Sequence, residues 1–180
     1  MKKNIYVILM ILLCFITTAC KDSASMAVER YLSKYNNLDT EVLTDMQNIV
    51  EKENLSEENK KLYQNIFEKQ YSDLSYKIVE EEYNGNEATI DVQITVYDLY
   101  KVQNDANNYL INHPEEFENE DGVYNPEIFI KYKLQQMKNN LDTVDYTLEF
   151  YVVKTKSGWE VSSLSTSDLE KIHGIYDYNR

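Results

Sequence analysis

The chain has 180 residues, of which 43% are hydrophobic, and its 31 Asp and Glu outweigh 18 Lys and Arg, giving a formal net charge of −13. A chain of this length forms one domain with a hydrophobic core of ordinary size. The acidic balance excludes a nucleic-acid-binding protein, which needs basic patches, and argues against a domain that lies flat on an anionic membrane.

The first nineteen residues are the most apolar part of the chain. Lys2 and Lys3 give them a positive start, and residues 5–16 contain no charge. As a helix, this stretch would cover about 18 Å, well short of the hydrocarbon core of a bilayer, which is about 30 Å thick. The pattern therefore predicts a secretory signal peptide and not a membrane span.

The apolar run ends in Thr17-Thr18-Ala19-Cys20. This stretch resembles the lipobox of bacterial lipoproteins, in which the signal is cleaved before a cysteine that carries a diacylglyceryl group. Ala19 and Cys20 match the pattern, whereas Thr17 stands where an aliphatic residue is usual. The resemblance implies cleavage between Ala19 and Cys20, and anchoring through Cys20 on the extracytoplasmic face of a Gram-positive cell membrane. An ordinary secretory signal or an uncleaved anchor is the alternative.

Cleavage would leave a folded part without a thiol, because Cys14 leaves with the signal and Cys20 is lipidated. The sequence therefore predicts neither a disulfide nor a cysteine metal site. A short tether would hold the domain close to the bilayer. We divide the chain into a signal peptide (1–19), a lipid-anchored tether (20–25), a single domain (26–174) and a tail (175–180).

The domain opens with three predicted helices. Apolar residues at helical spacing begin at Val28, and further stripes predict helices over about 40–53 and 57–72. The period then changes to two: residues 76–97 predict a hairpin of two strands that turns at Asn84-Gly85-Asn86.

The second half repeats the change of period. Helices are predicted over about 99–112 and 125–141, and the second begins with Asn125-Pro126, a cap followed by proline at the first helical position. A second hairpin follows over about 144–165. A short last helix begins at the capping box 167–170.

Helices packed on one face of a four-stranded antiparallel, two-hairpin curved sheet satisfy this order, so the sequence predicts an α+β fold. The helices, the curved sheet and a closing Gly158-Trp159-x-Val161 strand resemble the nuclear transport factor two-like or cystatin-like superfamily. The resemblance implies a cone with a pocket between helices and sheet. It implies no particular activity, because that fold hosts enzymes, binders and interaction modules.

The acidic loop 115–121 is the strongest local cluster of charge. With Gly122 at position six of an EF-hand loop, positions one and twelve would be Phe117 and Ile128, neither of which is a calcium ligand. We therefore predict a solvated connection between two helices, with irregular cation binding as the alternative.

His113 and His173 are the two histidines, and neither has a second ligand at helical spacing, so we predict neither a metal site nor a catalytic histidine. His173 falls in the last turn of the final helix, where a positive charge would complement the dipole. No Gly-x-Ser-x-Gly, phosphate loop or dinucleotide fingerprint occurs in the sequence, and we expect no cofactor. An enzyme using a buried carboxylate is a remote alternative, because Asp91, Asp145 and Glu149 fall on the outward sheet face.

The sixteen tyrosines are explained most simply by composition, but two sets suit binding because a ring can stack while its hydroxyl bonds. The first is a candidate binding surface on the outward sheet face, made of Tyr97, Tyr151, Gln93 and Glu149. The second is a candidate pocket lining under the helices, made of Tyr146 and Trp159.

Together these features predict a lipid-anchored extracytoplasmic lipoprotein whose single, non-catalytic domain engages an envelope protein. Binding of a small molecule or a peptide in a pocket between helices and sheet is the alternative. The membrane is met through the lipid anchor, and nucleic acid is excluded as a partner.

Overall fold

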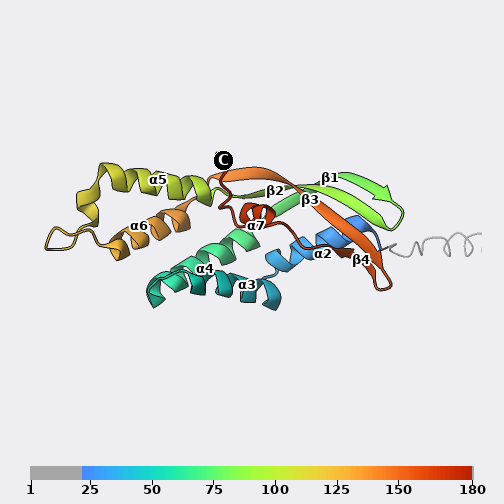
Figure 1. The fold of residues 1–180 in the computed structure, drawn as a ribbon, viewed down its shortest axis with the longest axis horizontal. Coiled ribbons are helices and arrows are strands. Elements are labelled where there is room, and N and C mark those ends of the chain that lie inside the picture. Colours follow the sequence, from blue (N-terminus) through green and yellow to red (C-terminus); the bar gives the residue numbers. More distant parts are fainter. Residues whose placement is uncertain (1–21, 180) are drawn as a thin grey trace, which may run out of the picture.

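The computed structural model describes residues 22–179, so the predicted signal peptide (1–19) and Cys20 lie outside the described residues. Its elements follow the predicted order of three helices, a hairpin, two helices, a hairpin and a short helix (Figure 1). In chain order they are α2 (Ala24–Asn36), α3 (Thr40–Lys52), α4 (Glu57–Ser72), β1 (Ser75–Asn84), β2 (Glu87–Tyr97), α5 (Leu99–Asn112), the 3-10 helix η1 (Pro114–Phe117), α6 (Pro126–Asn139), β3 (Thr143–Thr155), β4 (Gly158–Val161) and α7 (Thr166–Ile172).

The four strands form one antiparallel sheet in the order β1-β2-β3-β4. The central strands β2 and β3 alternate inward and outward side chains, and the inward set includes Ile90, Val92, Leu148 and Phe150, all fully buried. The predicted α+β fold with a four-stranded antiparallel sheet is therefore confirmed.

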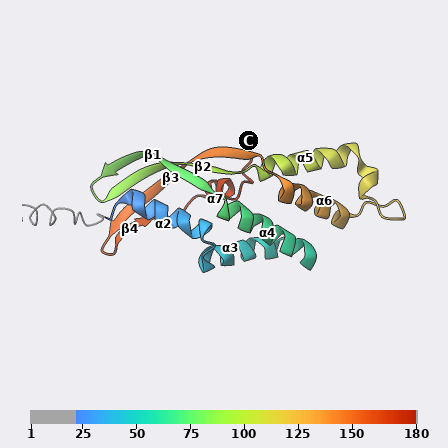
Figure 2. The same cartoon turned by 180° about the vertical axis from the view of Figure 1, so that it is seen from behind.

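Helices cover one face of this sheet. α2 contacts β2, β3 and β4, α7 contacts β2, and α4 packs beside α2, as Figures 1 and 2 show from opposite sides. Leu32 of α2, Phe67 and Tyr71 of α4 and Ile172 of α7 meet the inward sheet residues in one large core. Within residues 22–179, no helix covers the opposite face, whose central side chains are Thr, Asp, Glu and Gln.

α5, η1 and α6 extend beyond the sheet, and we call them the helical arm (residues 99–139; Figure 1). α5 and α6 pack on each other, and α6 also packs on α4. Their apolar stripes therefore face helices and not the sheet. The arm has two small cores. The inner one joins Leu99, Leu134 and Met137 to Ile66 of α4, and the outer one consists of Ala106, Phe117 and Phe129.

The folded domain begins earlier than the sequence suggested. Ala24 is fully buried, and Asp22 accepts a hydrogen bond from the Trp159 N–H at 2.9 Å and pairs with Arg30 at 3.0 Å. Residues 22–25, which the sequence analysis assigned to the tether, therefore belong to the domain. The sequence indicates this early start only weakly, because a polar residue such as Asp22 resembles part of a linker until its partner on a distant strand is known.

The last residues also pack on the domain. The ring of Tyr176 contacts that of Tyr146 with centroids 5.7 Å apart, and the Tyr178 hydroxyl donates to Asp98 at 3.1 Å. Residues 175–179 are therefore part of the fold and not a separate tail. α7 is capped by Ser165, two residues before the predicted capping box.

A buried polar junction joins α4, β2 and the end of α7. Gln70 is 1% exposed; its side-chain oxygen accepts from the Tyr97 N–H at 3.0 Å, and its nitrogen donates to the carbonyls of Tyr97 and Ile172 at 3.4 and 3.3 Å. Gly174 follows at φ 71°, and a Cβ there would clash with the Tyr97 carbonyl oxygen. The sequence predicted that Gly174 ends the last helix, but it did not predict that Gly174 packs against Gln70.

Candidate functional site

The outer end of the helical arm is an ordered surface that we call the arm tip (residues 111–128). It lies at the opposite end of the molecule from Asp22, the first described residue (Figures 1 and 2). Pro114 begins η1, and Phe117, 2% exposed, fixes the tip to the outer arm core through an edge contact with Phe129.

Short-range hydrogen bonds order the loop within the tip. The Asn119 side chain accepts from the N–H groups of Asp121 and Val123, each at 3.0 Å. Glu118 and Tyr124 form an isolated antiparallel bridge across the loop. Because its backbone groups are satisfied locally, the loop can hold outward side chains in a fixed arrangement.

Exposed apolar side chains concentrate in the arm tip. Nine large hydrophobic side chains are exposed among the described residues, and four of them lie here: Ile111 (73%), Val123 (59%), Tyr124 (48%) and Ile128 (38%). Apolar side chains gathered at one region of a surface are typical of interaction sites.

The charge of the tip has one sign. Between Lys101 and Lys131 the sequence has no Lys or Arg. The same stretch holds seven carboxylates, six of them in the tip: Asp105, Glu115, Glu116, Glu118, Glu120, Asp121 and Glu127. An apolar surface with acidic surroundings favours partners that combine apolar and basic side chains.

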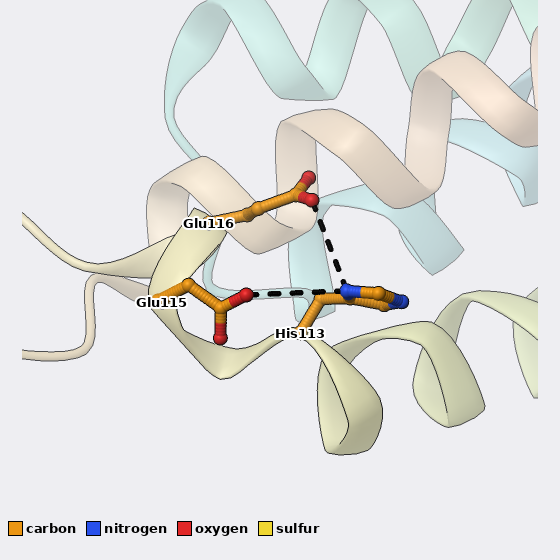
Figure 3. Close-up of side chains that lie close together, drawn as sticks. All are labelled: His113, Glu115 and Glu116. Atoms are coloured by element: carbon orange, nitrogen blue, oxygen red, sulfur yellow. Dashed lines mark ion pairs between the residues drawn. The ribbon is translucent and has the colours of Figure 1, made fainter.

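Three potential metal ligands meet at the start of η1 (Figure 3). The His113 Nδ1 atom lies 3.9 Å from Glu115 Oε1 and 4.0 Å from Glu116 Oε1, and no other group of three such side chains occurs among residues 22–179. The expectation that His113 has no second ligand at helical spacing is wrong, because Glu116 follows at i+3 and the turn that begins η1 brings Glu116 and Glu115 toward the imidazole.

The geometry fits ion pairs better than a metal. Ligand atoms about 2.0–2.1 Å from a tetrahedral zinc lie about 3.3 Å from one another, closer than these atoms are. His113 also stacks on Tyr109, with centroids 4.4 Å apart, and the Tyr109 hydroxyl donates to Glu116 at 2.8 Å. One half-buried imidazole and two exposed carboxylates from a single turn do not make a metal site.

A cleft of about 280 Å³ lies between α2, α3, α4 and α7. Its polar floor includes Tyr71 and His173, whose hydroxyl and Nδ1 atoms are 2.9 Å apart. Burial lowers the pKa of His173 to about 4 and raises the pKa of Tyr71, so both side chains are neutral near pH 7. The expectation that a charged His173 complements the helix dipole is therefore wrong, because the ring is buried against α4.

The four residues of the candidate binding surface do not form one cluster. Tyr97 and the Thr89 that pairs with Tyr151 are eight residues apart on β2, or about 26 Å along the strand. The Tyr97 hydroxyl donates to Asp73, the C-cap of α4, at 2.7 Å, and the Tyr151 hydroxyl donates to Glu87 at 2.8 Å. Gln93 and Glu149 lie between them, near the middle of the outward face.

The predicted pocket lining is also separated. Tyr146 lies near the start of β3, whereas Trp159 pairs with Lys154 near its end, about 26 Å along the strand. Trp159 contacts the ring of Tyr83 at 5.8 Å. These two residues therefore cannot line one pocket. The Tyr146 hydroxyl has no protein partner, and among the described residues it is the one buried side-chain polar atom in that state.

Carboxylates cross the outward face of the sheet in a row. Glu80 pairs with Asp91, and Asp91 pairs with Glu149, so like charges lie directly opposite on three neighbouring strands. Such pairs repel and cost stability. β1 is an edge strand, and a charge there opposes pairing with the strand of another molecule, which accounts for Glu80 but not for Asp91 and Glu149 on the central strands.

Asp98 is a buried carboxylate that the sequence analysis did not place. It is 7% exposed, and its two oxygens accept from the Lys101 N–H at 2.9 Å and from the Tyr178 hydroxyl. One oxygen of Asp98 therefore caps α5 and the other holds the C-terminal segment through Tyr178.

Comparison with protein-family models, with curated proteins and with solved structures finds no match to this chain. Among residues 22–179, no helix combines the length and apolar character that crossing a bilayer requires.

Proposed function

We propose that this chain is a bacterial lipoprotein with a non-catalytic interaction domain. Its signal peptide is removed, Cys20 carries the lipid, and the domain engages an envelope protein on the extracytoplasmic side of the membrane. The observation that carries the proposal is the placement of α2, the first described helix, and the arm tip toward opposite ends of the domain (Figures 1 and 2).

The folded domain starts almost at the proposed lipid. Asp22, two residues after Cys20, accepts from the Trp159 N–H, and this bond, with Arg30 beside it, holds the pKa of the Asp22 carboxyl below its usual range. Gly158 lies so close that a Cβ there would clash with Asp22 Oδ2. The α-carbons of Cys20 and Asp22 are at most about 7 Å apart. A lipidated chain would therefore hold this end of the domain against the bilayer.

The same geometry directs the arm tip away from the bilayer. With the chain start at the membrane, the sheet and α4 separate the tip from the lipid (Figure 1). Its apolar side chains and its negative charge then face the space where soluble parts of envelope proteins are found. This arrangement supports a domain that presents a docking surface at a fixed distance from the membrane.

The test is fractionation followed by in-cell crosslinking of the full-length, tagged protein, with Cys20→Ala as the control. We expect the wild-type protein in the membrane fraction with its signal removed, and one reproducible crosslinked protein that is lost in the control. Membrane retention of Cys20→Ala with normal signal removal would sink the lipoprotein part of the proposal, and the absence of any crosslinked protein would sink the interaction part.

Binding of a small molecule is the second candidate function, and the cleft between α2, α3, α4 and α7 favours it. Its lining includes the neutral Tyr71–His173 pair beside apolar side chains such as Val42 and Ile49, and polar groups that converge beside apolar ones orient small ligands. NMR of the His173 ring nitrogens during titration with indole, an apolar probe with one hydrogen-bond donor, tests the cleft. No change in those signals at saturating probe would argue against it.

A further inference from the structure

The arm tip and the outward sheet face are two acidic surfaces within residues 22–179, and the tip exposes more large apolar side chains. Four large hydrophobic side chains are exposed in the tip, whereas the middle of the sheet face carries Thr, Gln, Asp and Glu. Charge alone does not distinguish a docking site from a solvated face. The exposed apolar side chains make the tip the better candidate, because burying them on binding is favourable.

The tip is also built to hold its shape. Phe117 is anchored between Phe129 and Tyr132, with ring centroids 5.4 and 5.3 Å away. Asn119 fixes the backbone of the loop above it. An ordered surface loses less conformational entropy on binding than a mobile loop does. The outer arm core therefore supports Val123 and Tyr124 without covering them.

We infer that the arm tip docks a cationic segment of an envelope protein, in which Lys or Arg side chains flank apolar ones. The inference rests on the proposed function and names the surface and the chemistry of the partner. Val123, Tyr124 and Ile128 would meet the apolar residues, and Glu118, Glu120 and Asp121 would meet the basic ones. No Lys or Arg of the stretch between Lys101 and Lys131 competes for these carboxylates.

Site-specific photocrosslinking in cells tests the location. A benzophenone amino acid replaces Tyr124 in the tip or, as a matched control, Tyr151 on the sheet face, since these tyrosines are 48% and 47% exposed. The full-length lipidated protein is used in both cases. We expect capture of one protein from position 124 and not from position 151, with the crosslinked peptide rich in Lys or Arg beside apolar residues.

A pair of charge variants tests the chemistry. The tip variant combines Glu118→Gln, Glu120→Gln and Asp121→Asn, and the sheet variant combines Glu80→Gln, Asp91→Asn and Glu149→Gln, so both remove two Glu charges and one Asp charge. We expect the tip variant to reduce capture at position 124 at least about fivefold, as loss of contributing contacts does, and the sheet variant to leave it unchanged. Circular dichroism melting confirms that both variants fold.

The outcomes separate this inference from the proposed function. Capture from position 151 alone would leave an interaction module but overturn the tip as its docking surface. Equal loss in the two charge variants, or a crosslinked peptide without basic residues, would overturn the cationic partner. Capture from neither position would overturn the inference, and it would count against the proposed interaction only if the whole-protein crosslinking also found no partner.

Discussion

The sheet and the helical arm bury their apolar side chains in different ways. The sheet shares one large core with α2, α4 and α7, whereas the arm has two small cores of three or four buried residues each. The outward sheet face is polar, and the arm ends in exposed apolar side chains. The difference indicates a division of roles. The core under the sheet supplies most of the stability, whereas the exposed apolar side chains at the end of the arm are not explained by stability.

The largest expected effect comes from a pair of substitutions, one in the sheet core and one in the outer arm core. Phe150→Ala, in the sheet core, should lower the free energy of unfolding of the whole domain by about 3–5 kcal/mol, because it leaves a cavity under α2. Phe117→Ala, in the outer arm core, should instead loosen α5, η1 and α6 while the sheet stays folded. Hydrogen exchange by mass spectrometry measures both, and loss of protection throughout the sheet in Phe117→Ala would contradict the division.

The second effect is a pH dependence of the sheet core. His173 is buried and its pKa is lowered to about 4, so between the unfolded value of 6.5 and that value only the unfolded chain takes up its proton. The free energy of unfolding should therefore fall as the pH falls through this window, by about 2 kcal/mol from pH 7 to pH 4.5 for this group.

Urea unfolding at the two pH values measures this loss, with His173→Gln as the control because it has no group that titrates there. The difference between wild type and variant isolates the contribution of His173 from that of any other group that titrates between the two pH values. An equal loss in both proteins would show that His173 does not resist protonation in the folded state.

The third effect compares two glycines in left-handed conformations. Gly174 has φ 71° and abuts the Tyr97 carbonyl, whereas Gly85 has φ 63° and open space around it. Gly174→Ala should destabilise the domain by about 2 kcal/mol, and Gly85→Ala by about 1 kcal/mol, because both strain the backbone but only the first creates a clash. Thermal unfolding of the pair tests the central junction, and equal losses would remove the steric argument.

The smallest expected effect concerns the exposed ion pair that joins the helical arm to α4. Lys131 of α6 pairs with Glu58 of α4 at 2.8 Å, and both side chains are more than half exposed. Because exposed pairs contribute little, Glu58→Gln should leave the unfolding midpoint unchanged at physiological salt. Glu57→Gln, one residue away, is the matched control; a clear drop in Glu58→Gln alone would mean that this pair holds the arm in place.

Local patterns predicted the elements well because each depends on near neighbours in the chain. Alternation in residues 88–97 and 144–153 placed Ile90, Val92, Leu148 and Phe150 inward, and the structure buries all four. The Asn125-Pro126 cap and the glycine at 174 marked helix ends that the structure has. The candidate site was harder to predict: the acidity of the loop is evident from the sequence, but Val123 and Tyr124 look like ordinary loop residues until their exposure is known.

The sequence by itself determined the α+β class, the order of the elements and which face of each central strand is buried, because periodicity and capping are local. The tertiary structure alone decided the contacts between distant segments: Asp22 on Trp159, Gln70 between Tyr97 and Ile172, and His173 buried against Tyr71. It also turned α5 and α6 toward each other as an arm, since an apolar stripe shows that a helix must pack but not on what. The distance between Tyr97 and Tyr151, and between Tyr146 and Trp159, follows from strand register, which is set when the whole sheet assembles.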